Sequence, residues 1–181
     1  MHAAPYSSVA ASTPTKALLV SAALAAVQTG LFLLLLPALA TLAPAAPPLY
    51  ALVASANTAL PMLARILTRG AGTATITAGI TTVMVVAFSP IGILSAVPLL
   101  TAGAVFDLVA WKGAVSTRRL VLGAAAVGVA LFVISLAVFS PEHLVPGMLM
   151  ATLIGRLAGE AVIAVTVSAT VRLLRRAGVG R

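Results

Sequence analysis

Residues 17–36 read ALLVSAALAAVQTGLFLLLL, a stretch without a charged residue between Lys16 and Pro37. An α-helix needs about 20 predominantly apolar residues to cross the hydrocarbon core of a bilayer. Proline lacks the backbone donor that continues a helix. The stretch therefore predicts a transmembrane helix over 17–36 that ends at the proline.

The composition of the whole chain agrees with a membrane protein. Of the 181 residues, 61% are hydrophobic and 8% are charged, whereas soluble domains carry about 25% charged residues. The net charge is +8, but aromatic residues make up only 4%, which argues against a nucleic-acid-binding module. Because the chain has no cysteine, disulfides, thiolate metal sites and a cysteine nucleophile are excluded.

Further apolar runs predict an all-α bundle of six transmembrane helices. The stretch 37–48 holds four prolines and no charge, so we expect it to form an external loop. Residues 1–15 lack the basic segment of a signal peptide and are expected to be a flexible tail, followed by the membrane domain over 16–176 and a basic tail over 177–181. The five later helices are expected at about 48–67, with a kink at Pro61, and at 73–88, 90–111, 120–139 and 145–174.

The basic residues predict the orientation of this bundle. Lys and Arg near the ends of spans accumulate on the cytoplasmic side. With alternating spans, the connections 37–48, 88–91 and 140–144 carry no Lys or Arg. We therefore expect a multi-pass protein of the cell membrane with both termini in the cytoplasm. Ten basic residues fall on the same face: Lys16, Arg65, Arg69, Lys112, Arg118, Arg119, Arg172, Arg175, Arg176 and Arg181.

Three charged residues fall within the predicted spans. Arg156 and Glu160 are four residues apart, on one face of the last helix, and an intramembrane charge is a functional hypothesis by default. Asp107 lies at a similar predicted depth in the fourth helix, so Arg156 is a candidate to bridge the two acids. An ion cluster that only holds helices together, a ligand contact and a proton relay all fit this pattern.

Other polar and aromatic side chains are candidates for binding a small molecule. Two amides lie in the middle of the first and second predicted helices, where they can join helices or contact a ligand. Aromatic residues near the outer ends form either an interface belt or the rim of a mostly apolar pocket. With Arg156 and Glu160, the candidate substrate contacts are Gln28, Tyr50, Asn57, Phe88, Phe139 and His143.

Motifs for catalysis and for nucleotide binding are absent from the sequence. The chain contains no G-x-x-x-x-G-K-[ST], G-x-S-x-G or H-E-x-x-H motif. With three acidic residues and two histidines, the chain has few of the side chains that hydrolytic or metal catalysis uses. We expect no catalytic residue, no metal site and no cofactor.

Several features together resemble a known transporter family. Ala22 and Ala26 form a small-xxx-small pair in the first helix, R-G-A-G-T-A at 69–74 opens the third helix, and G-x-x-x-D at Gly103–Asp107 closes the fourth. Six compact helices with these motifs resemble the substrate-binding S components of energy-coupling factor (ECF) vitamin transporters. The likeness covers residues 16–176 and is nearest to the branch linked with thiamine or its hydroxymethylpyrimidine precursor, although that family usually carries Glu where this chain has Asp107.

The resemblance implies a function in import. An S component captures a vitamin or vitamin precursor from outside and docks on a transmembrane coupling subunit that two ATPases drive. Ala22 and Ala26 would then form the docking face, and Arg156, Glu160 and the outer aromatic residues would form the pocket. The alternative is a small secondary transporter that works alone, is coupled to protons through Asp107, Arg156 and Glu160, and forms a homo-oligomer.

Overall fold

In the described part of the chain, all regular secondary structure is helical. A computed structural model describes residues 14–88, 92–111 and 113–178. The all-α prediction is confirmed for these residues. In chain order the elements are α1 (Pro14–Ala45), α2 (Pro47–Ala54), the 3-10 turn η1 (Ser55–Thr58), α3 (Ala59–Thr68), α4 (Thr73–Phe88), α5 (Gly92–Ala110), α6 (Thr117–Leu136), the 3-10 turn η2 (Pro141–His143) and α7 (Pro146–Arg176).

Five helical stretches are long and apolar enough to cross a membrane. α4 is also apolar but has only 16 residues. The helices therefore fit a multi-pass membrane protein. The five stretches are Thr15–Ala45, Pro47–Thr68, Ile93–Ala110, Thr117–Leu136 and Pro146–Arg176. Residues 1–13, which hold most of the expected N-terminal tail, lie outside the described residues, as do residues 179–181.

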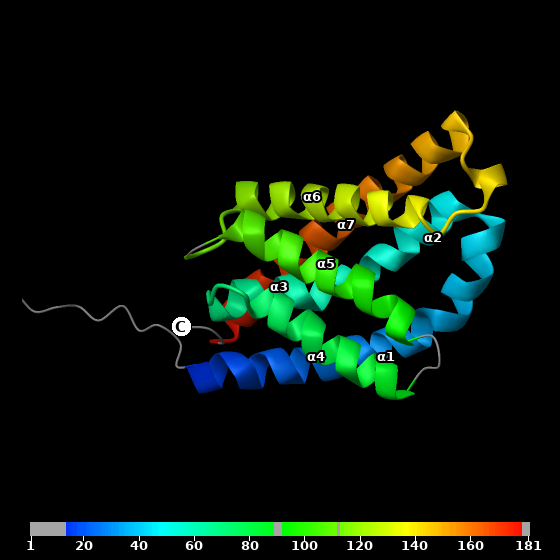
Figure 1. The fold of residues 1–181 in the computed structure, drawn as a ribbon. Helices are drawn as coiled ribbons and strands as arrows, with labels where there is room; N and C mark the ends of the chain where they lie inside the picture. The colour runs from blue at the N-terminus through cyan, green and yellow to red at the C-terminus, as the bar shows by residue number, and fades with distance from the viewer. Residues whose placement is uncertain (1–13, 89–91, 112, 179–181) are drawn as a thin grey trace, which may run out of the picture.

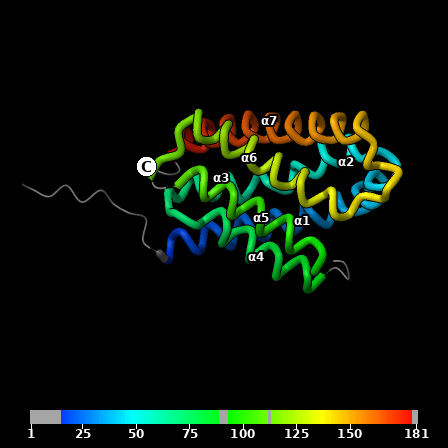
Figure 2. The backbone as a smooth tube through the Cα atoms, turned by 45° about the horizontal axis from the view of Figure 1, so that its top comes forward, coloured from blue at the N-terminus to red at the C-terminus, as the bar shows by residue number. Residues whose placement is uncertain are grey.

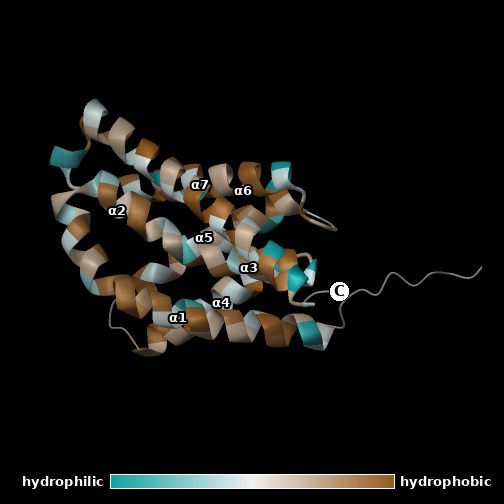
Figure 3. Cartoon of the chain, turned by 180° about the vertical axis from the view of Figure 1, so that it is seen from behind, coloured by the Kyte–Doolittle hydropathy of each residue, from teal (hydrophilic) through white to brown (hydrophobic). Residues whose placement is uncertain are grey.

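The outward faces of the helices are apolar, as a lipid environment requires. Large side chains with more than two thirds of their surface exposed occur on α1 (Leu34), α4 (Val83) and α5 (Leu94). Figure 3 shows hydrophobic residues along the helices and hydrophilic residues mainly near helix ends. A soluble monomer rarely exposes apolar surface on this scale.

The expected loop at 37–48 is wrong, because α1 continues through Pro37 and Pro44 to Ala45. A proline removes one intrahelical hydrogen bond, and prolines are tolerated within membrane helices. A proline inside a helix changes the direction of the helix axis. Figure 1 shows the last part of α1 turning away from its first part toward α2. The proline therefore ends the straight segment of α1 but not the helix.

The second predicted helix is interrupted by η1, one turn before the expected kink at Pro61. Proline cannot donate a hydrogen bond to the carbonyl four residues earlier, and its ring crowds that carbonyl. For Pro61 this carbonyl belongs to Asn57, within η1. The irregularity therefore lies where the proline acts rather than at the proline.

The helices run back and forth, so that several of their ends meet at the same end of the molecule. The start of α1, the end of α3, the start of α6 and the end of α7 lie together in Figures 1 and 2. We call this the basic end. These helix ends carry Lys16, Arg65, Arg69, Arg118, Arg119, Arg172, Arg175 and Arg176, whereas Lys112 and Arg181 lie outside the described residues.

Two glycines of α7 let its backbone pack directly against α2 and η1. A Cβ atom on Gly155 would overlap the carbonyl oxygen of Pro48. A Cβ atom on Gly159 would lie 2.6 Å from Ser55 Oγ and 2.7 Å from the carbonyl oxygen of Leu52. Small residues four apart let membrane helices approach closely. The spacing Gly155-x-x-x-Gly159 therefore sets the position of α7.

We predict that Gly155→Ala and Gly159→Ala each destabilise the protein by about 1–3 kcal/mol, because the added methyl groups overpack the contact. The measurement is the midpoint of thermal unfolding in detergent. Gly30→Ala in α1 is the matched control, since a Cβ there meets nothing within 4 Å. Equal unfolding midpoints for all three variants would contradict this account of the α7 contact.

Candidate functional site

The turn η1 carries polar side chains that join it to α1. The amide of Gln28, which is fully buried, donates through Nε2 to Oδ1 of Asn57 at 3.2 Å. The side-chain Oε1 of Gln28 accepts from the backbone N–H of Leu60 at 3.4 Å. The two amides predicted as substrate contacts are therefore brought together, and in this structure they bond to each other.

The same turn is joined to α7 by two hydroxyl groups. Thr58 Oγ1 donates to Oε2 of Glu160 at 2.9 Å. Ser55 Oγ lies 3.1 Å from the carbonyl oxygen of Ala51 and 3.5 Å from that of Arg156. We call Ser55, Thr58, Arg156 and Glu160 the polar centre. Sequence reasoning did not single out the two hydroxyl residues, because Ser and Thr are common in this chain and only the fold aligns them with α7.

The charges of the polar centre are enclosed, as the cost of a charge in an apolar span requires. Glu160 is 0% exposed and Arg156 is 5% exposed. On the side of α6, Gly128 leaves room for them, because a Cβ atom there would lie 3.2 Å from Glu160 Cγ. α2, η1 and α6 therefore surround this part of α7.

Two buried polar atoms of the centre have no hydrogen-bond partner, Nε of Arg156 and Oε1 of Glu160. The one ion pair within 4.0 Å among the described residues joins Arg65 and Asp107, so Arg156 and Glu160 form none. A buried polar atom left without a partner costs about 1–3 kcal/mol, and more when it is charged. A bound polar molecule or water can supply the missing donor and acceptor.

The expected bridge from Arg156 to Asp107 is wrong, because Asp107 is paired with Arg65. Arg65 Nε lies 3.4 Å from Asp107 Oδ1. The guanidinium also donates to the carbonyl oxygens of Gly113, at 3.2 Å, and of Trp111. Its side chain is 0% exposed. Arg65 was expected simply as a basic residue of a cytoplasmic connection; instead it is a buried clamp between the ends of α3 and α5.

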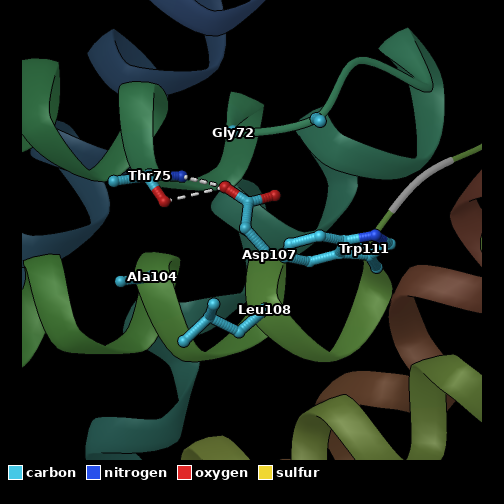
Figure 4. Close-up of a pocket in the computed structure, with 7 residues that line it drawn as sticks. Gly72, Thr75, Ala104, Asp107, Leu108 and Trp111 are labelled. Carbon is cyan, nitrogen blue, oxygen red and sulfur yellow. Dashed lines mark hydrogen bonds between the residues drawn. The ribbon is translucent and has the colours of Figure 1, made fainter.

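Asp107 also caps the N-terminus of α4. Its Oδ2 accepts from the backbone N–H and from the hydroxyl of Thr75, both at 2.8 Å (Figure 4). The first N–H groups of a helix have no intrahelical partner, and a carboxylate is favourable there. Gly103 permits the approach, because a Cβ atom would lie 2.8 Å from the carbonyl oxygen of Ala74. The G-x-x-x-D motif therefore has a packing role.

A hollow of about 350 Å³ opens beside this carboxylate at the basic end. Trp111, 60% exposed, forms part of its wall and has a positive φ of 39°. Asp107 Oδ2 accepts two hydrogen bonds, and Oδ1 makes no hydrogen bond but is ion-paired with Arg65, so the charge beside the hollow is already paired. It is lined by Ala71, Gly72, Thr75, Ala104, Asp107, Leu108 and Trp111 (Figure 4).

The outer aromatic candidates are only partly brought together. The rings of Phe139 and His143 contact each other edge to face, with centroids 6.2 Å apart, and Ser140 Oγ lies 2.9 Å from His143 Nδ1. Tyr50 is half-buried on α2, the helix that packs against α7. Phe88 is 68% exposed at the end of α4, whose main neighbours are α1, α3 and α5.

The face of α1 predicted for docking is open. Ala22 and Ala26 are exposed, whereas Ala25 is fully buried in the bundle. Gly30, one turn after Ala26, is exposed as well. The described residues contain no group of three His, Cys, Asp or Glu side chains that could hold a metal ion.

We predict that Arg65→Gln destabilises the protein by about 3–5 kcal/mol, because it leaves the buried Oδ1 of Asp107 without its counter-charge. The measurement is again the midpoint of thermal unfolding in detergent. Arg69→Gln, four residues later and exposed, is the matched control and should change stability by less than about 0.5 kcal/mol. The double variant Arg65→Gln/Asp107→Asn should lose less than the sum of its single variants, and strict additivity would refute the clamp.

Comparison with known proteins identifies no relative of this chain. No protein-family model matches it, and no curated protein or solved structure shows significant similarity to it. The likeness to ECF S components therefore remains a prediction from the sequence motifs, and function has to be argued from the polar centre, the basic end and the face of α1.

Proposed function

We propose that this chain is a substrate-binding membrane subunit of an ECF-type importer that captures a vitamin-like small molecule. The observation that carries the proposal is the polar centre, with its unpartnered Nε of Arg156 and Oε1 of Glu160. Enclosed charges within an apolar helix bundle are typical of substrate pathways. In this proposal the ligand completes the hydrogen bonds that the protein leaves open.

The proposed topology is six membrane crossings with both termini in the cytoplasm of a bacterial cell. The basic end supports it, because Lys and Arg are retained on the cytoplasmic side. α4 is the short crossing: 16 residues span ~24 Å at ~1.5 Å per residue. A helix shorter than the hydrocarbon core is accommodated by local thinning of the bilayer.

Cysteine labelling tests this topology cleanly, because the chain contains no cysteine of its own. Ala114→Cys lies in the connection between α5 and α6, and Leu144→Cys lies between α6 and α7; both positions are exposed. In intact cells, a membrane-impermeant maleimide should label Leu144→Cys and should label Ala114→Cys only after permeabilisation. Labelling of Ala114→Cys in intact cells would reverse the orientation and remove the proposed function.

The chemistry of the polar centre limits the kind of ligand. Arg156 offers a donor and Glu160 an acceptor, about one helical turn apart, so the ligand should carry an acceptor and a donor at similar spacing. In the proposal, Gln28 and Asn57 exchange their mutual hydrogen bond for contacts to the ligand. Tyr50, Phe88, Phe139 and His143 would line the route from outside. A thiamine-related vitamin or precursor meets these requirements, since its rings carry both donors and acceptors.

Energy coupling is proposed to occur through α1. Its exposed Ala22 and Ala26 allow another helix to approach closely in lipid, where small residues favour association. The proposed partners are a transmembrane coupling subunit and two ATPase subunits, because the chain has no nucleotide-binding motif. Co-purification of these subunits with the chain would support this arrangement.

We predict that Arg156→Met weakens ligand binding at least about tenfold, or about 1.4 kcal/mol, because the ligand loses a buried charged donor. The small molecule that accompanies the purified chain is first identified by mass spectrometry, and its affinity is then measured by equilibrium dialysis. Arg176→Met, at an exposed position of the basic end, is the control. Unchanged affinity for Arg156→Met would assign the residue to helix packing alone.

One observation favours the second candidate, a secondary transporter that works alone as a homo-oligomer. Glu160 is a single buried carboxylate with one free oxygen, which is the kind of group that proton-coupled transporters use. Flux measurements separate the two candidates. Ligand uptake into liposomes that contain only this chain, driven by a pH gradient, would favour the secondary transporter over the importer subunit.

A further inference from the structure

A groove of about 520 Å³ runs between α6 and α7 on the outside of the bundle. Its floor is formed by small residues, among them Ala124 and Ala164, which are 2% and 5% exposed. Its walls are formed by larger apolar side chains, Val121 and Val165, which are 55% and 67% exposed. Small residues between larger ones therefore leave an apolar furrow along the two helices.

The groove is polar at one end only. Thr117, Ser168 and Arg172 line it at the basic end, and the remaining lining residues are apolar. Arg172 is exposed, and the ion pair in the described residues involves other side chains. None of the acidic residues of the chain lines the groove. The mouth therefore combines a positive charge with hydroxyl groups, a combination that attracts phosphate.

The N-terminus of α6 adds to this positive mouth. Thr117 is the first residue of α6, and the cap Ser116 accepts the N–H of Arg119; the remaining first-turn N–H groups and the helix dipole favour an anion. Arg118 and Arg119, both exposed, follow directly. Arg172 comes from α7, so two helices contribute to the mouth independently.

The dimensions of the groove match one leaflet of a bilayer. From Leu157, at its apolar end, to Ser168 the rise along α7 is ~16 Å. Half of the hydrocarbon core is ~15 Å. If α7 enters the core at Pro146, it leaves it after ~20 residues, close to Ser168, which puts Arg172 at headgroup level. Charge and length therefore select the same occupant.

We propose that this groove is a binding site for an anionic phospholipid of the leaflet at the basic end. One acyl chain lies along the alanine floor, and the phosphate meets Arg172, Thr117 and the N-terminus of α6. The site needs the chain to span a bilayer but does not depend on the proposed import function.

Native mass spectrometry of the purified full chain tests the site. The protein is equilibrated with equal amounts of dioleoylphosphatidylglycerol and dioleoylphosphatidylcholine, which share acyl chains and differ in headgroup charge. Wild type should retain the anionic lipid at least about fivefold more than the zwitterionic lipid, the effect of about one basic residue at a membrane surface. Arg172→Gln should remove this preference, whereas Arg176→Gln, outside the groove, should retain it.

A second pair of variants tests the acyl-chain groove. Ala161→Leu fills the groove and should lower retention of both lipids at least about fivefold. Ala158→Leu is the control, because Ala158 is also exposed on α7 but does not line the groove. The proposal is overturned if wild type shows no headgroup preference, if Arg176→Gln matches Arg172→Gln, or if Ala161→Leu leaves lipid retention unchanged. A dimer that Ala161→Leu dissociates without loss of lipid would assign the groove to a second copy of the chain. If Ala161→Leu does not elute as a folded protein, the arginine pair decides alone.

Discussion

The contact of α7 with α2 and η1 is the constraint on which the interior depends. Lipid tails are as apolar as leucine, so helices in a bilayer associate through close packing and hydrogen bonds rather than through the hydrophobic effect. Gly155 and Gly159 bring the backbones together. Only at that distance can Thr58 donate to Glu160. The same two glycines therefore provide the packing between the helices and align the polar side chains within it.

The two charged clusters differ in how their charges are paired. At the basic end, Arg65 donates to two carbonyl groups and Asp107 Oδ2 accepts from Thr75. The two atoms there without a hydrogen bond, Arg65 Nε and Asp107 Oδ1, lie 3.4 Å apart in an ion pair. In the polar centre, Arg156 Nε and Glu160 Oε1 also lack a hydrogen bond, and they form no ion pair within 4.0 Å. A cluster with paired charges stabilises a single arrangement, whereas one with unpaired charges is stabilised by whatever completes it. This contrast separates a structural clamp from a candidate binding site.

The positions of the helices could be predicted because each apolar run consists of residues that are adjacent in the sequence. The lengths of apolar runs and the basic residues that bound them gave α4 at its observed limits, Thr73–Phe88. The continuation of α1 past Pro37 was missed, since proline removes one bond but does not forbid a helix in this environment. Of the interior, the burial of Arg156 and Glu160 followed from the cost of charges in an apolar span. The pairing of Asp107 with Arg65 could not be predicted, because it depends on the approach of α5 to α3 and α4. The spacing Gly155-x-x-x-Gly159 is a small-xxx-small pattern, but sequence reasoning did not single it out as a helix contact.

The position of the polar centre along α7 connects the interior with the surface groove. In the proposed topology α7 enters the hydrocarbon core at Pro146. Arg156, ~15 Å further by helical rise, is then near the middle of a ~30 Å core, where neither headgroup region can hydrate it. The same rise then puts Ser168 at the boundary of the core and the last turns of α7, with Arg172, Arg175 and Arg176, among the headgroups. The 31 residues of α7 exceed a simple crossing, and in this topology the excess carries positive charge into the headgroup region. A charge at that level favours anionic lipid and retention on the cytoplasmic side, so the proposed orientation also determines from which side the polar centre is reached.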